Sequence, residues 1–356
     1  MEAGLPLYLT PMVRAWQCKK RGLCCKYQGV QIDEVERRRL ERKLREVGDP
    51  LAERLAPGVI ERAQGWPILP RDGEHCVFLG EDNLCGVRRR FGDGVYPQVC
   101  KKFPYLSLLT DDRHVVGLSF QCPTALQLLA AEPGFEVVVE PAGEPPVERV
   151  AFVGNEDREA FDLAGDRIGI AAFWRLHWSL FDHFRSRSEA SPFERLRAFA
   201  EEVTGEVVPE RVGMAPKHWR QGAFEPSIAD ALERAAGHVP EGLPAFWMHV
   251  PPQPFELDPL PPVDEDALLL RYLLHRFFCP SFYLHACDPA FLLTNLFAMV
   301  ARYRVERERG FDPLAAVRNL DRFFVHSGGA AAILGSGSTS AAWRAMAALA
   351  RAAMEP

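Results

Sequence analysis

The sequence predicts a mainly α-helical protein. An irregular, cysteine-rich N-terminal domain with short strands (1–145) is expected, followed by an all-α helical bundle (146–356). Three observations support this prediction: seven of the nine cysteines lie before residue 123, a Pro-, Gly- and Glu-rich stretch interrupts the chain at 132–150, and helical spacing of apolar residues dominates the rest. A hydrophobic content of 47% and a charged content of 25% are typical of globular proteins.

The N-terminal part contains one helix with a clear start and end. Asp33 is followed three residues later by Glu36, which is the spacing of a capping box, and Gly48 closes the segment. We therefore expect a helix over roughly 34–47, with a charged face that is typical of solvent exposure. A short strand run is expected within 132–150, the connector that sets the domain boundary near residue 145.

The C-terminal part consists of predicted helices separated by loops. Apolar and aromatic residues follow helical spacing at 171–184, and another helix fits 264–278. Three further helices begin with a capping residue followed by proline, whose φ suits the first helical turn, and each runs into glycine. These starts are Ser191-Pro192, Asp288-Pro289 and Asp312-Pro313. Because no period of 20–50 residues repeats, a solenoid is not expected.

The seven early cysteines are the strongest functional signal. They are Cys18, Cys24, Cys25, Cys76, Cys85, Cys100 and Cys122. Thiolates select zinc, copper(I) and iron–sulfur clusters, and one zinc ion or one [4Fe–4S] cluster takes four ligands. Seven thiols exceed either requirement, so some are structural, one is exchangeable, or His75 or His114 completes a second metal set. Burial as small apolar residues is the alternative for each thiol, but it suits the adjacent pair Cys24–Cys25 poorly.

Basic residues surround the first cysteines. Between Arg14 and Lys26 the chain has five Lys and Arg residues and no acid. Four thiolates around a metal leave a net charge of about −2, which these residues can offset. Three glycines can also expose backbone N–H groups to sulfur; they are Gly22, Gly80 and Gly86.

Three cysteine-containing segments resemble a known family. CKKRGLCC (18–25), CVFLGEDNLCGV (76–87) and CKKFPYLS (100–107) are similar to the cysteine-cluster family of zinc- or iron-chelating proteins, which opens with CxxCxxCC. Three of the four opening cysteines match, and Arg21 stands in place of the second. The resemblance implies a metal or iron–sulfur site that draws its ligands from all three segments.

The longer layout resembles the flagellin lysine-N-methylase family within this group. The similarity lies in the lead LYLTPMVRAWQC (7–18), in Cys122-Pro123, and more loosely in FFVHS (323–327) within a helical region from 264. The resemblance implies an iron–sulfur cluster and transfer of a methyl group from S-adenosylmethionine to lysines of a protein substrate, flagellin-like or other. The residues alone leave two alternatives open, a non-catalytic structural or redox metal module and a metal carrier.

No catalytic or cofactor-binding residue is identified from the sequence. The Gly-rich stretch 333–343 lacks the strand context of a nucleotide site, and the spacing C-x3-C-x2-C of radical enzymes is absent. Packed core is the favoured interpretation of CPSFYLHAC (279–287), with its two cysteines and His285, and of His177 and His183. His326 attracts interest only through the family-like FVHS.

Charge and hydropathy exclude several classes of function. A net charge of −6 argues against a general nucleic-acid binder. No signal-peptide pattern and no apolar stretch of the ~20 residues needed for a membrane span is visible. We therefore expect a cytoplasmic protein without a membrane partner, where reduced thiols do not form a disulfide framework.

Overall fold

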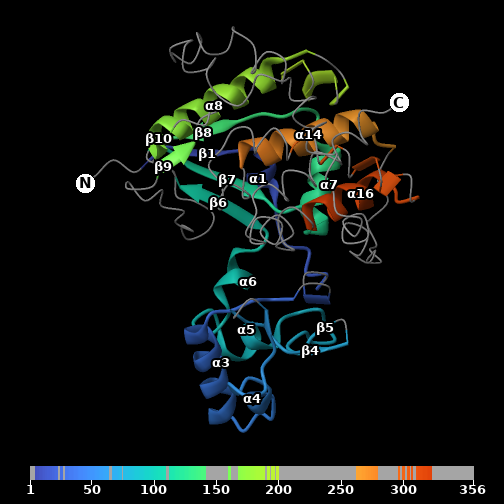
Figure 1. The fold of residues 1–356 in the computed structure, drawn as a ribbon. Helices are drawn as coiled ribbons and strands as arrows, with labels where there is room; N and C mark the ends of the chain where they lie inside the picture. Colours follow the sequence, from blue (N-terminus) through green and yellow to red (C-terminus); the bar gives the residue numbers. More distant parts are fainter. Residues whose placement is uncertain are drawn as a thin grey trace, which may run out of the picture.

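The computed structural model places the described residues in two lobes (Figure 1). Two segments of the chain connect the lobes, one before residue 25 and one after residue 96, and they are called the two crossings. The described residues are 5–22, 25–26, 29–63, 66–73, 75–109, 112–141, 159–161, 167–188, 191–192, 194–196, 198–199, 262–279, 296, 299–300, 303–304, 306–307 and 310–322. The upper lobe in Figure 1 is called the sheet lobe, and the lower one, formed by residues within 25–96, the small lobe.

The sheet lobe is built on a four-stranded mixed sheet. Its strands are β1 (Leu7–Leu9), β6 (Tyr105–Leu109), β7 (His114–Leu118) and β8 (Val138–Glu140), in the order β6-β7-β1-β8. β1 runs parallel to β7 and antiparallel to β8, with Tyr8 opposite both Val115 and Val139. Every residue of β7 is buried, so this central strand is covered on both faces.

Helices pack around this sheet. They are α1 (Pro11–Ala15), α7 (Pro123–Ala131), α8 (Ile170–Ser186), α14 (Glu265–Phe278) and α16 (Pro313–Asp321). α14 contacts β7, α7, α8 and α16, so it lies at the centre of the helical layer (Figure 1). A two-stranded hairpin of β9 (Glu159–Phe161) and β10 (Arg167–Gly169) leads directly into α8.

One hydrophobic core holds the sheet lobe together. It contains residues of the strands β1 and β7, such as Leu9 and Val116, together with Phe184, Tyr272 and Leu320 of the later helices. Segments far apart in the sequence therefore share one interior. The predicted domain boundary near residue 145 stays a prediction, and this core draws on both sides of it.

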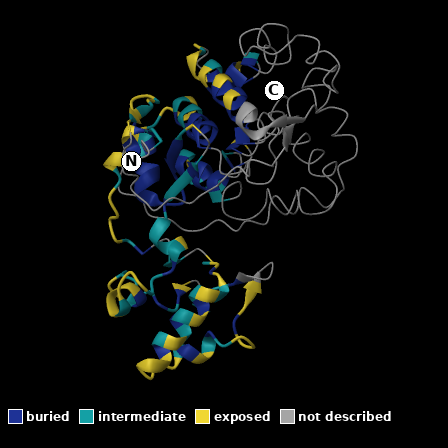
Figure 2. Cartoon of the chain, turned by 90° about the vertical axis from the view of Figure 1, so that its left-hand side faces the viewer, coloured by how far each residue is buried: buried dark blue, intermediate teal, exposed yellow. Residues whose placement is uncertain are grey.

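The small lobe has a core of its own. Its elements are α3 (Glu34–Glu46), α4 (Leu51–Arg54), β2 (Arg62–Ala63), β3 (Trp66–Pro67), β4 (Arg71–Asp72), β5 (His75–Cys76) and α5 (Gly86–Phe91). Buried and exposed residues alternate along α3 (Figure 2), which turns Leu40 and Leu44 inward against Leu55, Phe78 and Val87. The short helix α6 (Gln98–Lys102) lies between the two lobes (Figure 1).

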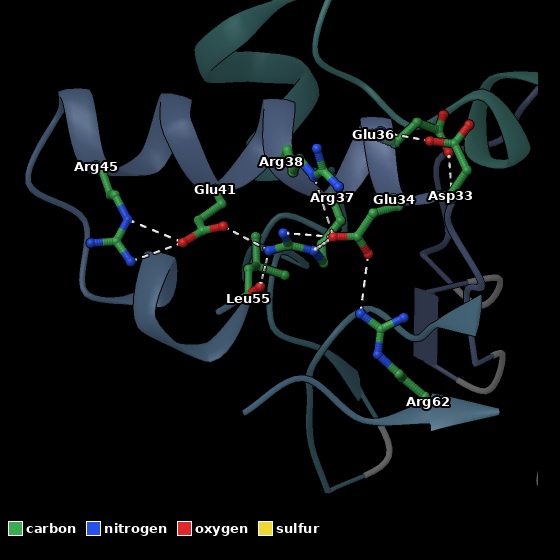
Figure 3. A network of polar contacts seen from close by, with 9 residues as sticks. All are labelled: Asp33, Glu34, Glu36, Arg37, Arg38, Glu41, Arg45, Leu55 and Arg62. Carbon is green, nitrogen blue, oxygen red and sulfur yellow. Dashed lines mark hydrogen bonds and ion pairs between the residues drawn. The ribbon is translucent and has the colours of Figure 1, made fainter. Parts of the chain in front are cut away.

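Polar contacts fix both the start and the inner face of α3 (Figure 3). The Asp33 carboxylate accepts from the Glu36 N–H at 2.7 Å, and the Glu36 carboxylate accepts from the Asp33 N–H at 3.2 Å. Arg37 is buried and donates to the carboxylates of Glu34 and Glu41 and to the Leu55 carbonyl. These bonds satisfy a buried guanidinium, whose desolvation would otherwise be costly.

The predicted helices are confirmed where the structure describes them. The capping box at Asp33 begins α3, and the segments predicted at 171–184 and 264–278 form α8 and α14. Asp312 caps α16 by accepting from the N–H groups of Leu314 and Ala315. The described residues after Ser191 and between 296 and 307 are helical, while the start at Asp288 lies outside the described residues. β8 confirms a strand within 132–150.

The structure is about half helical and contains short strands in the N-terminal part, as expected, but the assembly of these strands into a small mixed sheet was not predicted. The sheet joins residues 7–9 to 114–116 in parallel, a pairing between distant segments that local patterns do not reveal. The described residues after 145 also include the β9–β10 hairpin, so this part of the chain is not wholly helical. None of the described helices has the length and apolar character needed to cross a membrane.

Candidate metal centre

A closed loop in the small lobe carries Cys76 at one end and Cys85 at the other. The Leu79 N–H donates to the Cys76 carbonyl at 2.9 Å, and the Gly86 N–H donates to the Phe78 carbonyl at 2.7 Å. A β-bridge sets Cys85 opposite Leu79, and α5 begins immediately after Cys85. These bonds close the loop between Phe78 and Gly86 and place Cys85 opposite Leu79.

The turn that contains Cys25 packs on this loop. The Gly22 carbonyl accepts from the N–H groups of Cys25 and Lys26 at 2.9 and 3.0 Å. Gly22 has a φ of 67°, and a Cβ at this position would meet the Asn83 side chain at 3.0 Å. Glycine is therefore required here both for the backbone conformation and for the close approach of the two segments.

Three of the predicted ligands thus meet in one core. Cys76 is buried in the core of the small lobe, and Cys25 and Cys85 are half-buried against it. Their thiols have the donor chemistry of a zinc or iron–sulfur site. Within the described residues, no three His, Cys, Asp or Glu side chains stand close enough together to hold a metal ion. Cys25, Cys76 and Cys85 therefore share this core without forming such a group, and the adjacent Cys24 lies outside the described residues.

Glycine N–H groups and basic residues were expected to support the metal centre, but two of the glycines and one of the basic residues have other partners. The Gly80 N–H donates to the Leu84 carbonyl at 2.9 Å, so the N–H groups of Gly80 and Gly86 serve the loop instead of sulfur. Arg14 pairs with Glu140 of β8. In contrast, Arg71 connects the two cysteine-containing segments, because it is the ladder partner of Cys76 and donates to the Lys26 carbonyl at 2.8 Å.

The remaining early cysteines lie on the two crossings and in the sheet lobe. Cys122 is buried at the start of α7, where the Trp16 indole donates to its sulfur at 3.3 Å. The Lys19 ammonium donates to the Gln127 side chain of α7, which draws the exposed Cys18 toward the same helix. Cys100 is half-buried on α6. The structure therefore separates Cys122 from the thiols of the small lobe.

The histidines considered as extra ligands have different surroundings. His75 is exposed on β5, next to Cys76 in the chain. His114 is buried at the start of β7, with its Nε2 at 2.5 Å from the Ser107 hydroxyl. His114 is thus part of the sheet, and Cys122 follows the opposite end of the same strand.

Core packing is confirmed for two residues that had competing interpretations. Cys279 is buried against Gly117, and burial raises the pKa of its thiol to about 11. His177 is buried among Trp174, Trp178 and Phe277. Cys287, His285, His326 and the Gly-rich stretch 333–343 lie outside the described residues.

Sequence reasoning missed a buried charged pair in the sheet lobe. Arg276 of α14 and Asp321 of α16 have no exposed surface, and their charged groups lie 3.5 Å apart. In the sequence, the only sign of this pair was that both charges fall on the apolar faces of their helices.

Comparison with known proteins adds no assignment: no protein-family model, no curated sequence and no solved structure matches the chain.

Proposed function

We propose that the protein binds a zinc ion or an iron–sulfur cluster through thiolates of the small lobe. The proposed ligands are Cys25, Cys76 and Cys85 together with Cys24, the neighbour of Cys25 in the chain. The observation that carries the proposal is the convergence of Cys25, Cys76 and Cys85, from two separate segments, on one core. If these thiols were only small apolar residues, all three would be expected inside the core, whereas Cys25 and Cys85 are half-buried at its edge beside the buried Cys76.

The charge of the surroundings supports the proposal. Thiolate ligands leave a negative centre, and a nearby guanidinium stabilises the deprotonated form. Arg71 is held between the two segments by its bond to the Lys26 carbonyl and its ladder position opposite Cys76. A basic residue is therefore bonded to both segments that carry the proposed ligands.

Cys18, Cys100 and Cys122 are proposed as a second group. They lie on the two crossings and at the start of α7, where one of them could serve as an exchangeable ligand or the group could hold a second metal. Methyl transfer from S-adenosylmethionine to protein lysines is supported by the family resemblance alone. Metal or cluster binding is the function that the described residues support best.

Paired cysteine variants test this proposal. The full chain and its variants Cys76→Ala, Cys85→Ala and Cys279→Ala are purified without oxygen, and iron, zinc and acid-labile sulfide are measured per chain. Loss of one ligand should lower the metal content to below about half of the original value, since binding depends on the complete set. Cys279→Ala is the matched control because its thiol lies in the other core. Full metal in both small-lobe variants would refute the ligand assignment.

A further inference from the structure

The turn that precedes Cys122 is held by a buried carboxylate from the far end of the chain. Asp321, the last residue of α16, is fully buried. One of its oxygens accepts from the Ser119 hydroxyl at 2.9 Å and from the N–H groups of Phe120 and Gln121 at 2.8 and 3.2 Å. Successive backbone N–H groups that point to one oxygen form an anion-binding nest, which fixes the conformation of the turn.

Helices α14 and α16 strengthen this arrangement. The Arg276 guanidinium donates to the Leu118 carbonyl, lies 3.5 Å from the Asp321 carboxylate and sits over the Phe120 ring. The Gln121 side chain donates to the Arg318 carbonyl at 2.5 Å. Each residue from 118 to 121 is thereby bonded to a helix that lies about 150 to 200 positions later in the chain.

The fixed turn determines where the Cys122 thiol lies. The Cys122 N–H donates to the Ser119 carbonyl at 3.3 Å, and α7 starts at the next residue. The other end of α7 is also held by α14, because Arg271 donates to the Glu132 carbonyl at 2.7 Å. Cys122 therefore stands on a helix that the C-terminal region holds at both ends.

We propose that Asp321 is a positioning residue for Cys122 and that it couples the C-terminal helices to the cysteine framework. This proposal rests on the proposed function only in treating Cys122 as a metal ligand. A buried charge pair is a costly way to gain stability alone, since apolar residues of similar volume often do as well. A carboxylate that orders three successive residues provides instead a defined geometry for the residue that follows.

The test measures the reactivity of single cysteines. Full-length protein and its Asp321→Asn variant are labelled with iodoacetamide, and the labelling rate of each cysteine is followed by peptide mass spectrometry. Asn cannot bind the three donors as a carboxylate does, so Cys122 should react at least about tenfold faster through local opening. Cys279, in the same core, and Cys76, in the small lobe, should change less than about twofold. General destabilisation would instead accelerate all three.

An unchanged Cys122 rate, or equal acceleration of the three cysteines, would overturn the proposal. If Asp321→Asn does not fold, Ser119→Ala decides the question, because it removes one donor and keeps both backbone N–H bonds. This variant should accelerate Cys122 by about threefold, and no acceleration would overturn the proposal. Metal content is measured on the same samples. Selective acceleration in a protein that holds no metal would uphold the positioning role and refute the ligand role.

Discussion

Replacing the buried His177 by leucine should make the protein less sensitive to acid. The His177 ring is 1% exposed and packs edge-on against Trp178, with ring centroids 4.6 Å apart. Burial lowers its pKa from 6.5 to about 3; the nearby Phe277 backbone opposes this shift, and the positive charge of Arg113 adds to it. The imidazole is therefore neutral in the folded protein at pH values well above 3.

The sign of the effect follows from the lowered pKa. The unfolded chain binds a proton at this histidine below a pH of about 6.5, whereas the folded chain does so only near 3. The contribution of the neutral His177 to the free energy of unfolding is thus fully present above pH 6.5 and is lost as the pH falls toward 3. At pH 5 the loss is RT ln(1 + 10^1.5), or about 2 kcal/mol, and the limit at very low pH is roughly 5 kcal/mol.

Urea unfolding at pH 7.5 and 5.0 measures this difference. The free energy of unfolding of the original protein should fall by about 2 kcal/mol more than that of His177→Leu over this range. Ser179→Leu on the same helix is the control, because the Ser179 side chain is exposed and carries no group that titrates in this pH range. Equal pH dependence of the original protein and His177→Leu would refute the account of a buried neutral imidazole.

Two further predictions concern the start of α3 and the resembled activity. Asp33→Ala should lower the free energy of unfolding of the small lobe by about 1 kcal/mol, measured in urea, because the Glu36 N–H loses its partner; Val35→Ala, at an exposed position, should change it by less than about 0.5 kcal/mol. If the protein is a lysine methylase, anaerobically purified full chain should release or absorb heat on titration with S-adenosylmethionine. Absence of heat with an intact cluster would contradict methyl transfer.

Local signals predicted the helices because the information lies within a few residues. The spacing of Asp33 and Glu36 identified α3, and Asp312 with Pro313 identified α16. The sheet depends on pairing between residues 7–9 and 114–116, and no short pattern encodes that contact. Burial of a charge such as that of Asp321 becomes tolerable only when a distant turn supplies its donors, and no short pattern indicates such a turn.

For the cysteines too, local sequence signals predicted one part of the arrangement and contacts between distant segments determine the rest. The sequence identified the thiols as a set, but it did not distinguish those that gather in the small lobe from Cys122 in the other core. That separation depends on two crossings of the chain between lobes (Figure 1). Similarly, Gly80 and Gly86 were expected to direct N–H groups to sulfur, whereas the loop itself uses both.

Thiolates of the small lobe are proposed to hold a metal centre. Analysis of iron, zinc and acid-labile sulfide in full-length protein purified without oxygen, together with its absorption spectrum, tests whether they do. We predict about one zinc ion per chain without colour, or about four iron and four sulfide per chain with visible absorption. Less than about 0.1 equivalents of either metal in soluble, folded protein would contradict the claim.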